Sequence, residues 1–486
     1  SKEQLAAIVK QTKELKAYQK MADTPEAIKT IPMLSLSDIT PQTDRLQLKQ
    51  EMVDGAQMLH FPETTNKIIY LQLYFDAAVV AQEDVPYVSL LADVLGQLDT
   101  KSYTFGQFST ETNKHTGRLN SYNKMFIDMR DGKGYAPKVV IEGKAFRHKL
   151  GKMLHLADEL AMGTKFTDKK RMQQVLNKLN SRYQAHARRN GIGLAMYRLA
   201  SYYAGHAQYN ERINGLSYIH FMAETTRTFD KNGDQVMAKL AAVAKQIFQR
   251  KRLIVGVTGN DDDYRVVKEQ LPAFLAKLGQ LDKPPVKYAF AKPKTNEALL
   301  SASKVQYVVK GANYRSLGFQ FNGRLQVLSQ ILSSEYLQKK IRQQGGAYGS
   351  WANFRRSGLG YFASYRDANV NKTLDNYDKA IDWVKNFNTS PDEMTRYIIG
   401  TIADLDKPET PSVKGRRAIS YHLQNVSYKD RQTERDMILK TTVKDIQSLG
   451  AMLEKTLKSG NICVYGNEKK LQEKKELFND LIKVIQ

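Results

Sequence analysis

Residues 341–350, IRQQGGAYGS, place a cationic and a phenolic side chain on either side of two adjacent glycines. Apolar residues at helical spacing stop before Gly345, and a strand pattern begins after Gly346. Arg342 is therefore expected in the last turn of a helix and Tyr348 at the start of the next strand. Because glycine readily takes left-handed conformations, Gly345 and Gly346 can end the helix abruptly and let the two side chains converge.

A guanidinium and a phenol are both hydrogen-bond donors, and this defines the chemistry open to the pair. Two donors aimed at one point suit the oxyanion that forms when water attacks a peptide carbonyl, and one such donor contributes about 3–4 kcal/mol. Neither group can activate the water itself. The structural alternative is that Arg342 complements the negative end of the helix dipole while Tyr348 is an amphipathic strand residue. From the residues alone, this alternative is preferred.

The elements around the pair follow from the hydrophobic pattern of the second half of the chain. A strand and a long helix are expected before the glycines, and a hairpin, further helices and a closing strand after them. The predicted ranges are, in order, 305–309, 325–341, 347–354 with 359–367, 371–387, a helix from Ser390, and 461–467. The helix from Ser390 carries a capping box, with Ser390 as N-cap, Pro391 at the first helical position and Glu393 able to reach back.

The first half of the chain follows a similar order of elements. It begins with a helix over about 1–21 and a proline-containing linker. The predicted ranges are then a strand 66–76, a helix 86–98, a second short helix, strands 118–130 and 138–146, helices over 147–204 and 230–249, and a strand 253–260. Both halves close on a strand that ends in V-x-G-N. We therefore predict a helical linker segment, 1–45, and two α+β units of one duplicated type, 46–275 and 290–486.

The sequence offers no convincing metal site. No two histidines have the i, i+4 spacing that places two imidazoles on one helical face for zinc. The eight are His60, His115, His148, His155, His186, His206, His220 and His422. In HLADEL the second histidine is missing, and the acids Asp261 to Asp263 are better explained as the start of a helix. The single cysteine, Cys463, lies in an apolar strand pattern and is expected to be a small buried residue without a disulfide partner.

Charge and hydropathy bear on possible partners. Lysine and arginine exceed aspartate and glutamate by 74 − 50 = 24, which favours polyanions and keeps nucleic-acid binding as a hypothesis. The basic residues are spread along the chain among helix-face apolar residues, however, so a solvated surface is the preferred interpretation. No apolar run reaches the roughly 18 residues of a membrane span, and no targeting signal is visible. The compartment is left open.

Longer stretches resemble a known family. KKIRQQGGAYGSWANF and GYFASYRDANVNKTLDNYDKAIDWVKNF resemble the C-terminal half of the inverzincin zinc metallopeptidases, in the branch of presequence protease and falcilysin, relatives of insulysin and pitrilysin. The N-terminal helix and its linker resemble the segment that joins the two halves of such enzymes, and LLADVLGQLDTKSYTFGQFSTETNKHTGRLN resembles their third domain. The resemblance implies an α+β fold in which two related domains, each a mainly antiparallel sheet packed with helices, form one bowl-shaped half of a peptidase chamber.

The resemblance also assigns roles to residues. In the family, zinc is held only in the first domain, by an H-x-x-E-H helix and a more distant Glu. The corresponding helix here aligns Val88, Leu91 and Ala92 with the ligands and the base, so this chain is expected to bind no metal. The family draws an Arg and a Tyr from its fourth domain to the substrate, and these map onto Arg342 and Tyr348.

The resemblance reverses the preference for a structural role. It implies the C-terminal half of a zinc metalloendopeptidase that degrades unstructured peptides, in which Arg342 and Tyr348 stabilise the tetrahedral intermediate. Zinc and the general base would come from an N-terminal half of the same protein or from a partner subunit, and this chain alone would be inactive. A second hypothesis is a non-catalytic scaffold subunit of the same fold, and a third is a basic nucleic-acid-binding protein.

Overall fold

The computed structural model describes residues 1–18, 21, 24, 26–27, 30 and 33–485. The chain divides into two compact units, Ser1–Thr40 and Pro41–Gln486. The first unit contains the helix α1 (Lys2–Tyr18), which buries none of its residues, and a short 3-10 helix, Leu36–Asp38. The predicted N-terminal helix is thus present, whereas part of the predicted linker lies outside the described residues. None of the helices in the described ranges is long and apolar enough to cross a membrane.

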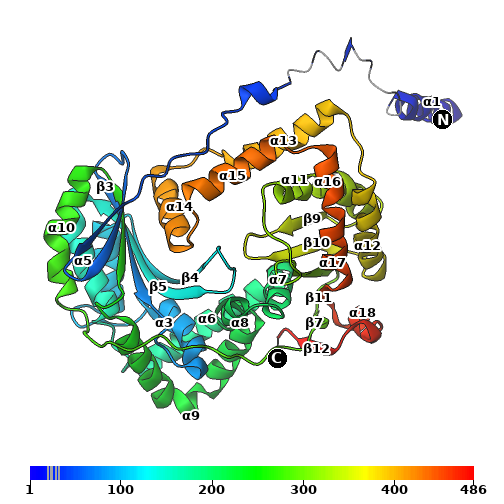
Figure 1. Ribbon diagram of the computed structural model, residues 1–486. Coiled ribbons are helices and arrows are strands. Elements are labelled where there is room, and N and C mark those ends of the chain that lie inside the picture. The colour runs from blue at the N-terminus through cyan, green and yellow to red at the C-terminus, as the bar shows by residue number, and fades with distance from the viewer. Residues whose placement is uncertain (19–20, 22–23, 25, 28–29, 31–32, 486) are drawn as a thin grey trace. The chain divides into compact units, whose positions relative to one another are not determined.

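The second unit contains two six-stranded sheets (Figure 1). The first sheet has the strand order β1-β2-β6-β3-β5-β4, in which only β2 and β6 are parallel neighbours. Its strands are β1 (Lys49–Val53), β2 (Ala56–Pro62), β3 (Ile68–Asp76), β4 (Arg118–Ile127), β5 (Tyr135–Phe146) and β6 (Ile254–Gly259). The second sheet has the order β12-β7-β11-β8-β10-β9, and β7 lies parallel to both β11 and β12. Its strands are β7 (Glu297–Ser301), β8 (Gln306–Asn313), β9 (Gly349–Phe354), β10 (Leu359–Asp367), β11 (Asn461–Asn467) and β12 (Asp480–Lys483).

The two sheets repeat one topology. The run β2-β6-β3-β5-β4 corresponds strand for strand to β7-β11-β8-β10-β9, with the same parallel pair at one end and antiparallel pairs elsewhere. Each sheet then adds one strand of its own, β1 or β12, beyond the parallel pair. The predicted α+β class, with mostly antiparallel sheets packed by helices, is confirmed.

Helices cover both sheets. Those that follow the first strands are α3 (Val85–Val94), α4 (Phe105–His115), α5 (Leu150–Ala161), α6 (Lys169–Arg189), α7 (Gly191–Ser201), α8 (Gly205–Asn214), α9 (Leu216–Ile247) and α10 (Asp261–Leu275). Those of the second half are α11 (Arg324–Ile331), the π-helix η4 (Leu332–Gln343), α12 (Asn371–Lys385), α13 (Pro391–Leu405), α14 (Pro411–Leu423), α15 (Tyr428–Leu439), α16 (Val443–Ser448), α17 (Gly450–Lys458) and α18 (Glu468–Gln472).

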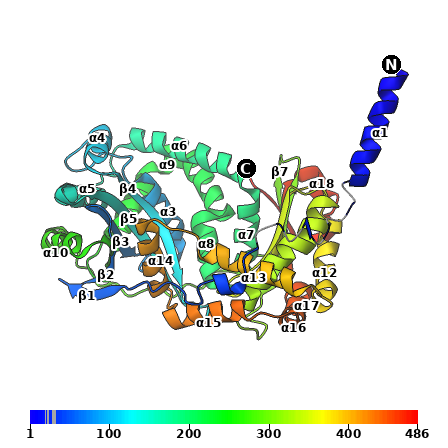
Figure 2. The same ribbon diagram turned by 90° about the horizontal axis from the view of Figure 1, so that it is seen from above.

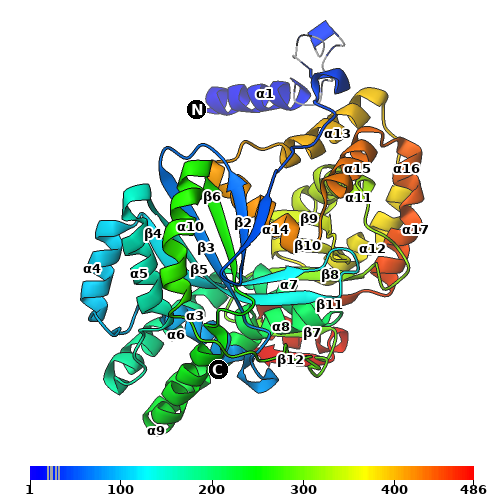
Figure 3. The same ribbon diagram turned by 60° about the vertical axis from the view of Figure 1, so that its left-hand side comes forward.

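The first sheet is covered by its own helices on one face and by a distant helix on the other. Residues of α3, α5, α9 and α10 form a large core with the apolar side chains of β2, β3, β5 and β6. Figure 3 shows α5 and α10 on one side of this sheet and α14 on the other. Ile419 of α14 packs against Leu59, Tyr74 and Val140. A Cβ on Gly415 would lie 1.9 Å from Thr258 Oγ1, so glycine is needed where α14 meets β6.

The second sheet receives a helix from the first half in return. Leu194, Ala195 and Leu199 of α7 share a core with Tyr307 and Cys463 of the second sheet. Figure 2 shows α7 and α8 between the strands of the two sheets. Because each sheet is covered by a helix from the other half of the chain, residues 41–486 form one compact unit. The division at 46–275 and 290–486 remains a prediction.

A buried ion cluster fastens α7 to the second sheet. Arg198 donates from Nε and Nη2 to the two carboxylate oxygens of Glu297 at 2.6 and 2.7 Å. Tyr202 also donates to Glu297, at 2.7 Å, and Glu211 lies 3.6 Å from the Arg198 guanidinium. The side chains of Glu211 and Glu297 are both only 1% exposed. These charges therefore depend on one another rather than on water.

Candidate functional site

The helix that leads to the glycine turn changes its winding before it ends. It is an α-helix up to Ile331 and a π-helix from Leu332 to Gln343. At the change, Ser333 and Ser334 donate from their hydroxyls to the carbonyls of Ser329 and Gln330, at 2.6 and 2.8 Å. Such bonds to the carbonyl four residues back distort an α-helix. π-helices are rare, usually short and frequent at functional sites.

A signal for this winding is present in the sequence, although the sequence analysis treated the whole segment as one regular helix. The buried residues of the π-helix are Leu332, Tyr336, Leu337 and Ile341, spaced by four and five residues. An α-helix buries residues three and four apart. The longer spacing therefore indicates the wider turn.

The turn itself contains one left-handed glycine, not two. Gly346 has a φ of +79°, and its N–H donates to the Arg342 carbonyl at 2.9 Å, while Ala347 N–H donates to the Ile341 carbonyl at 3.1 Å. Gly345 is not left-handed, so that part of the prediction is wrong. A Cβ on Gly345 would lie 2.5 Å from the Ile341 carbonyl oxygen, so glycine is needed there for close approach rather than for its φ.

The two predicted donors lie on either side of this turn with little to hold them. Arg342, in the last turn of the π-helix, is exposed and makes one weak bond, from Nη1 to Gln338 Oε1 at 3.4 Å. Tyr348 is 69% exposed. Its N–H donates to the Tyr365 carbonyl at 3.0 Å, and its ring meets that of Tyr365 edge-on at 6.2 Å. Among the described residues, no contact joins Arg342 to Tyr348 and none satisfies the Tyr348 hydroxyl.

The repeated topology provides an internal comparison for this position. Tyr348 is the residue before β9, and the residue before the corresponding strand β4 is Gly117. Gly117 has no side chain, and a Cβ there would lie 2.9 Å from Lys144 Cε. An exposed phenol at this point is therefore not a requirement of the fold.

The helix that resembles a zinc helix has no ligand atoms. Val88, Leu91 and Ala92 of α3 are buried in the first core. Within the described ranges, no three histidines, cysteines or acids lie close enough together to hold a metal ion. The residues present therefore do not fit zinc.

The other sequence features that suggested metal ligands have structural roles. Asp263 forms a capping box with Asn260 at the start of α10, as predicted for the acids after β6. His155 instead pairs with the Tyr103 hydroxyl at 3.2 Å. Cys463 is buried and free, as predicted. At the start of α13, Ser390 accepts from Glu393 N–H as expected, but the Glu393 carboxylate bonds to the Thr389 hydroxyl, so the predicted capping box is only half formed.

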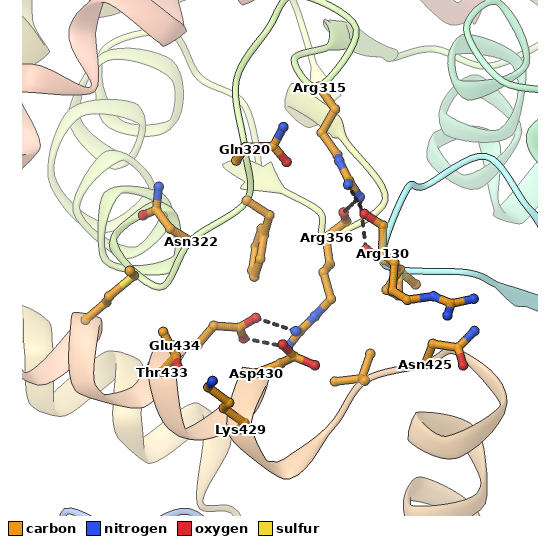
Figure 4. Close-up of a pocket in the computed structure, with 14 residues that line it drawn as sticks. Arg130, Arg315, Gln320, Asn322, Arg356, Asn425, Lys429, Asp430, Thr433 and Glu434 are labelled. Atoms are coloured by element: carbon orange, nitrogen blue, oxygen red, sulfur yellow. Dashed lines mark hydrogen bonds and ion pairs between the residues drawn. The ribbon is translucent and has the colours of Figure 1, made fainter.

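A basic hollow that the sequence analysis missed lies between the β4–β5 and β9–β10 turns and α15, with a volume of about 420 Å³ (Figure 4). Arg315 donates to the carbonyls of Met129 and Arg356 at 3.0 and 3.2 Å, tying the two turns together. The Arg356 side chain points away from Arg315 and pairs with Glu434 of α15.

The other cations of this hollow leave little free charge. Arg130 is paired with Asp128, so that of the four cations lining the hollow only Lys429 makes no hydrogen bond or ion pair among the described residues. The hollow therefore serves as a joint between turns. We take the glycine turn with Arg342 and Tyr348 as the candidate site.

Comparisons with known proteins identify the family. A model of the family described as associated with the C group of the M16 peptidases matches residues 1–224, and one of the "PreP C-terminal domain" matches residues 296–467. "Protein HypA" of Clostridium perfringens is 35% identical over 99% of this chain and 49% of its own length. "Presequence protease 1, chloroplastic/mitochondrial" of Arabidopsis thaliana is 29% identical over 93% of this chain and 42% of its own length. The chain thus spans about half the length of the curated relatives it matches.

Solved structures agree with this assignment at the level of the fold. A peptidase M16 inactive domain from Pseudomonas fluorescens has a TM-score of 0.63 at 16% identity, covering 87% of this chain and 98% of that one. A protease from Helicobacter pylori has a TM-score of 0.61 at 15% identity, covering 87% and 100%. With both family models and the presequence protease relatives in agreement, the chain belongs to the presequence protease branch of the M16 peptidases and corresponds to the C-terminal half of such proteins.

Proposed function

We propose that this chain is the non-zinc-binding half of a zinc metalloendopeptidase that degrades unstructured peptides inside a closed chamber. Its role is to supply substrate contacts and two hydrogen-bond donors, Arg342 and Tyr348, for the oxyanion of the tetrahedral intermediate. Zinc and the general base belong to an N-terminal half, in the same protein or in a partner subunit. On its own the chain is inactive, because neither donor can activate water.

The observation that carries the proposal is the lack of partners for both donors at one turn. Arg342 has a single weak bond, and the Tyr348 hydroxyl has none among the described residues. Donors that are not engaged within the chain remain available to an acceptor from outside it. Preorganised donors aimed at developing negative charge are usually the largest single contribution to this kind of catalysis. The two groups are expected to converge on the substrate carbonyl rather than on each other.

The experiment that tests the proposal measures cleavage of a quenched fluorescent, unstructured peptide. The chain is assayed alone and mixed with the N-terminal half of its parent protein, and bound zinc is measured in each sample. Activity and zinc that appear only in the mixture are expected. If a folded, zinc-loaded partner binds this chain and no peptide is cut, the alternative of a non-catalytic scaffold subunit replaces the proposal.

The left-handed glycine offers a more local test. Gly346→Ala in the full-length protein is expected to cost about 1–2 kcal/mol of stability, because an L-residue is strained at positive φ. It should also lower turnover by about tenfold or more, since small displacements of catalytic groups are costly. Turnover and urea unfolding are the measurements.

Gly318→Ala is the matched control for this variant. Gly318 has a φ of +92°, and, as at Gly346, nothing lies within 4 Å of an added Cβ. The same backbone strain is expected there without a loss of turnover. Equal turnover in the two variants would separate the glycine turn from catalysis.

A further inference from the structure

The glycine turn is fastened by a residue that the sequence analysis did not consider. Asn369, in the loop between β10 and α12, donates from Nδ2 to the Gly345 carbonyl at 2.8 Å. This carbonyl lies just beyond the end of the π-helix, where backbone acceptors have no partner within the helix. The bond joins the turn to a loop that lies 24 residues further along the chain.

A buried carboxylate holds Asn369 in place. Asp367 has 0% exposure and accepts the Asn369 N–H at 2.9 Å and the Thr373 hydroxyl at 2.7 Å. No ion pair of the described residues includes Asp367. A buried carboxylate without a cation needs such donors, and the positive end of α12, which begins at Asn371, adds to them. The loop is therefore built around Asp367, with Asn369 fixed at its edge.

The exit of β10 supports the turn at a second point. The register between β10 and β8 shifts between Ser364 and Asp367, and Arg366 takes a φ of +51°, which is unfavourable for a side chain other than glycine. Immediately before this residue, the Tyr365 carbonyl accepts the Tyr348 N–H at 3.0 Å. Both ends of the segment from Gly345 to Tyr348 are thus bonded to the residues 365–369.

Such support matters because the turn contains two glycines. Glycine loses more conformational freedom on ordering than any other residue, so a Gly-Gly turn is flexible unless outside contacts restrict it. The Asn369 amide restricts it at the carbonyl between Arg342 and Tyr348. We propose that Asn369 is a positioning residue, which holds the turn so that Arg342 and Tyr348 present their donors together. This inference rests on the proposed function.

The test compares variants of the full-length, zinc-loaded protein. Asn369→Ala removes the amide, and Asn369→Asp keeps its size but replaces the donor with an acceptor. Asn386→Ala is the matched control, because the exposed Asn386 amide donates to the Asp382 carbonyl at a similar distance, 2.9 Å, away from the turn. We expect both Asn369 variants to lower kcat by about tenfold with KM changed less than about twofold. The control should match the wild type.

Two further measurements separate positioning from general stability. On a Tyr348→Phe background, Asn369→Ala should lower kcat by less than about twofold, because residues that act through one another are not additive. Hydrogen exchange of the 344–348 amides should be at least about fivefold faster in Asn369→Ala than in the wild type or the control.

The outcomes distinguish this inference from the function on which it rests. If wild-type protein cuts peptides and the Asn369 variants keep their kcat, or lose equally with and without the Tyr348 hydroxyl, Asn369 does not position the donors. Unchanged hydrogen exchange at the turn would also overturn the inference. A zinc-loaded wild type that cuts no peptide would overturn the proposed function, and the catalytic role of Asn369 with it.

Discussion

Tyr348→Phe in the full-length protein is expected to lower peptide turnover by about a hundredfold or more, the usual cost of removing one oxyanion donor. The substitution removes only a hydroxyl that has no partner among the described residues. The ring keeps its edge-on contact with Tyr365, and the backbone bond to that residue is unaffected. Zinc content and the midpoint of thermal unfolding should therefore stay at their wild-type values, while kcat falls.

Tyr428→Phe provides a control with the same chemical change. The Tyr428 hydroxyl on α15 donates to Gln432 at 3.2 Å and faces no proposed substrate. Its loss should leave kcat within about twofold of the wild type, since a single exposed hydrogen bond contributes little. If both tyrosine variants turn peptides over at the wild-type rate, Tyr348 is an amphipathic strand residue and Arg342 merely caps a helix dipole.

Local patterns predicted most of the elements that carry this pair. The hairpin over 347–354 and 359–367 and the helix before it are present, because their apolar residues are dense and periodic. The strand β2 was missed. Its sequence, AQMLHFP, includes Gln57 and His60 among apolar residues, and it becomes a strand by pairing with β6, nearly 200 residues away. Local propensity is weak where the pairing partner is so distant.

The arrangement of helices on the sheets was beyond the sequence patterns. Amphipathic periodicity identifies a buried face of α7 and of α14, but not the sheet against which that face packs. Each packs against the sheet of the other half. The same limit applies to the candidate site. The glycines mark the turn, whereas the bond from Asn369 depends on a loop that folds back from β10.

Replacing Arg198 is expected to cause the largest loss of stability, because this residue compensates two buried carboxylates. Arg198→Met keeps much of the side-chain volume and removes the charge. Glu297 would retain only the Tyr202 hydroxyl, and Glu211 would lose its cation. Breaking a buried ion pair from one side typically costs about 3–5 kcal/mol. Urea unfolding of the wild type and the variant measures the difference.

A half-exposed pair provides the control. Arg182 lies 2.7 Å from Asp93, with the Arg182 side chain 55% exposed, so Arg182→Met should cost about 1 kcal/mol or less. The double variant Arg198→Met/Glu297→Gln should regain part of the loss, because the second change removes the uncompensated charge. A loss in Arg198→Met no larger than in Arg182→Met would mean that α7 is held to the second sheet by apolar packing alone.

The loss should also depend on pH through Glu211. Burial raises the pKa of Glu211 to about 7 from an ordinary value of 4.5. The folded protein therefore keeps a proton that the unfolded chain has released, so this carboxyl's contribution to stability is full below pH 4.5 and is lost as the pH rises through 7. At pH 8 Glu211 is charged and needs Arg198, whereas at pH 5.5 it is neutral. Arg198→Met should thus be more destabilising at pH 8, and equal losses at both values would exclude Glu211 from the cluster that joins the two sheets.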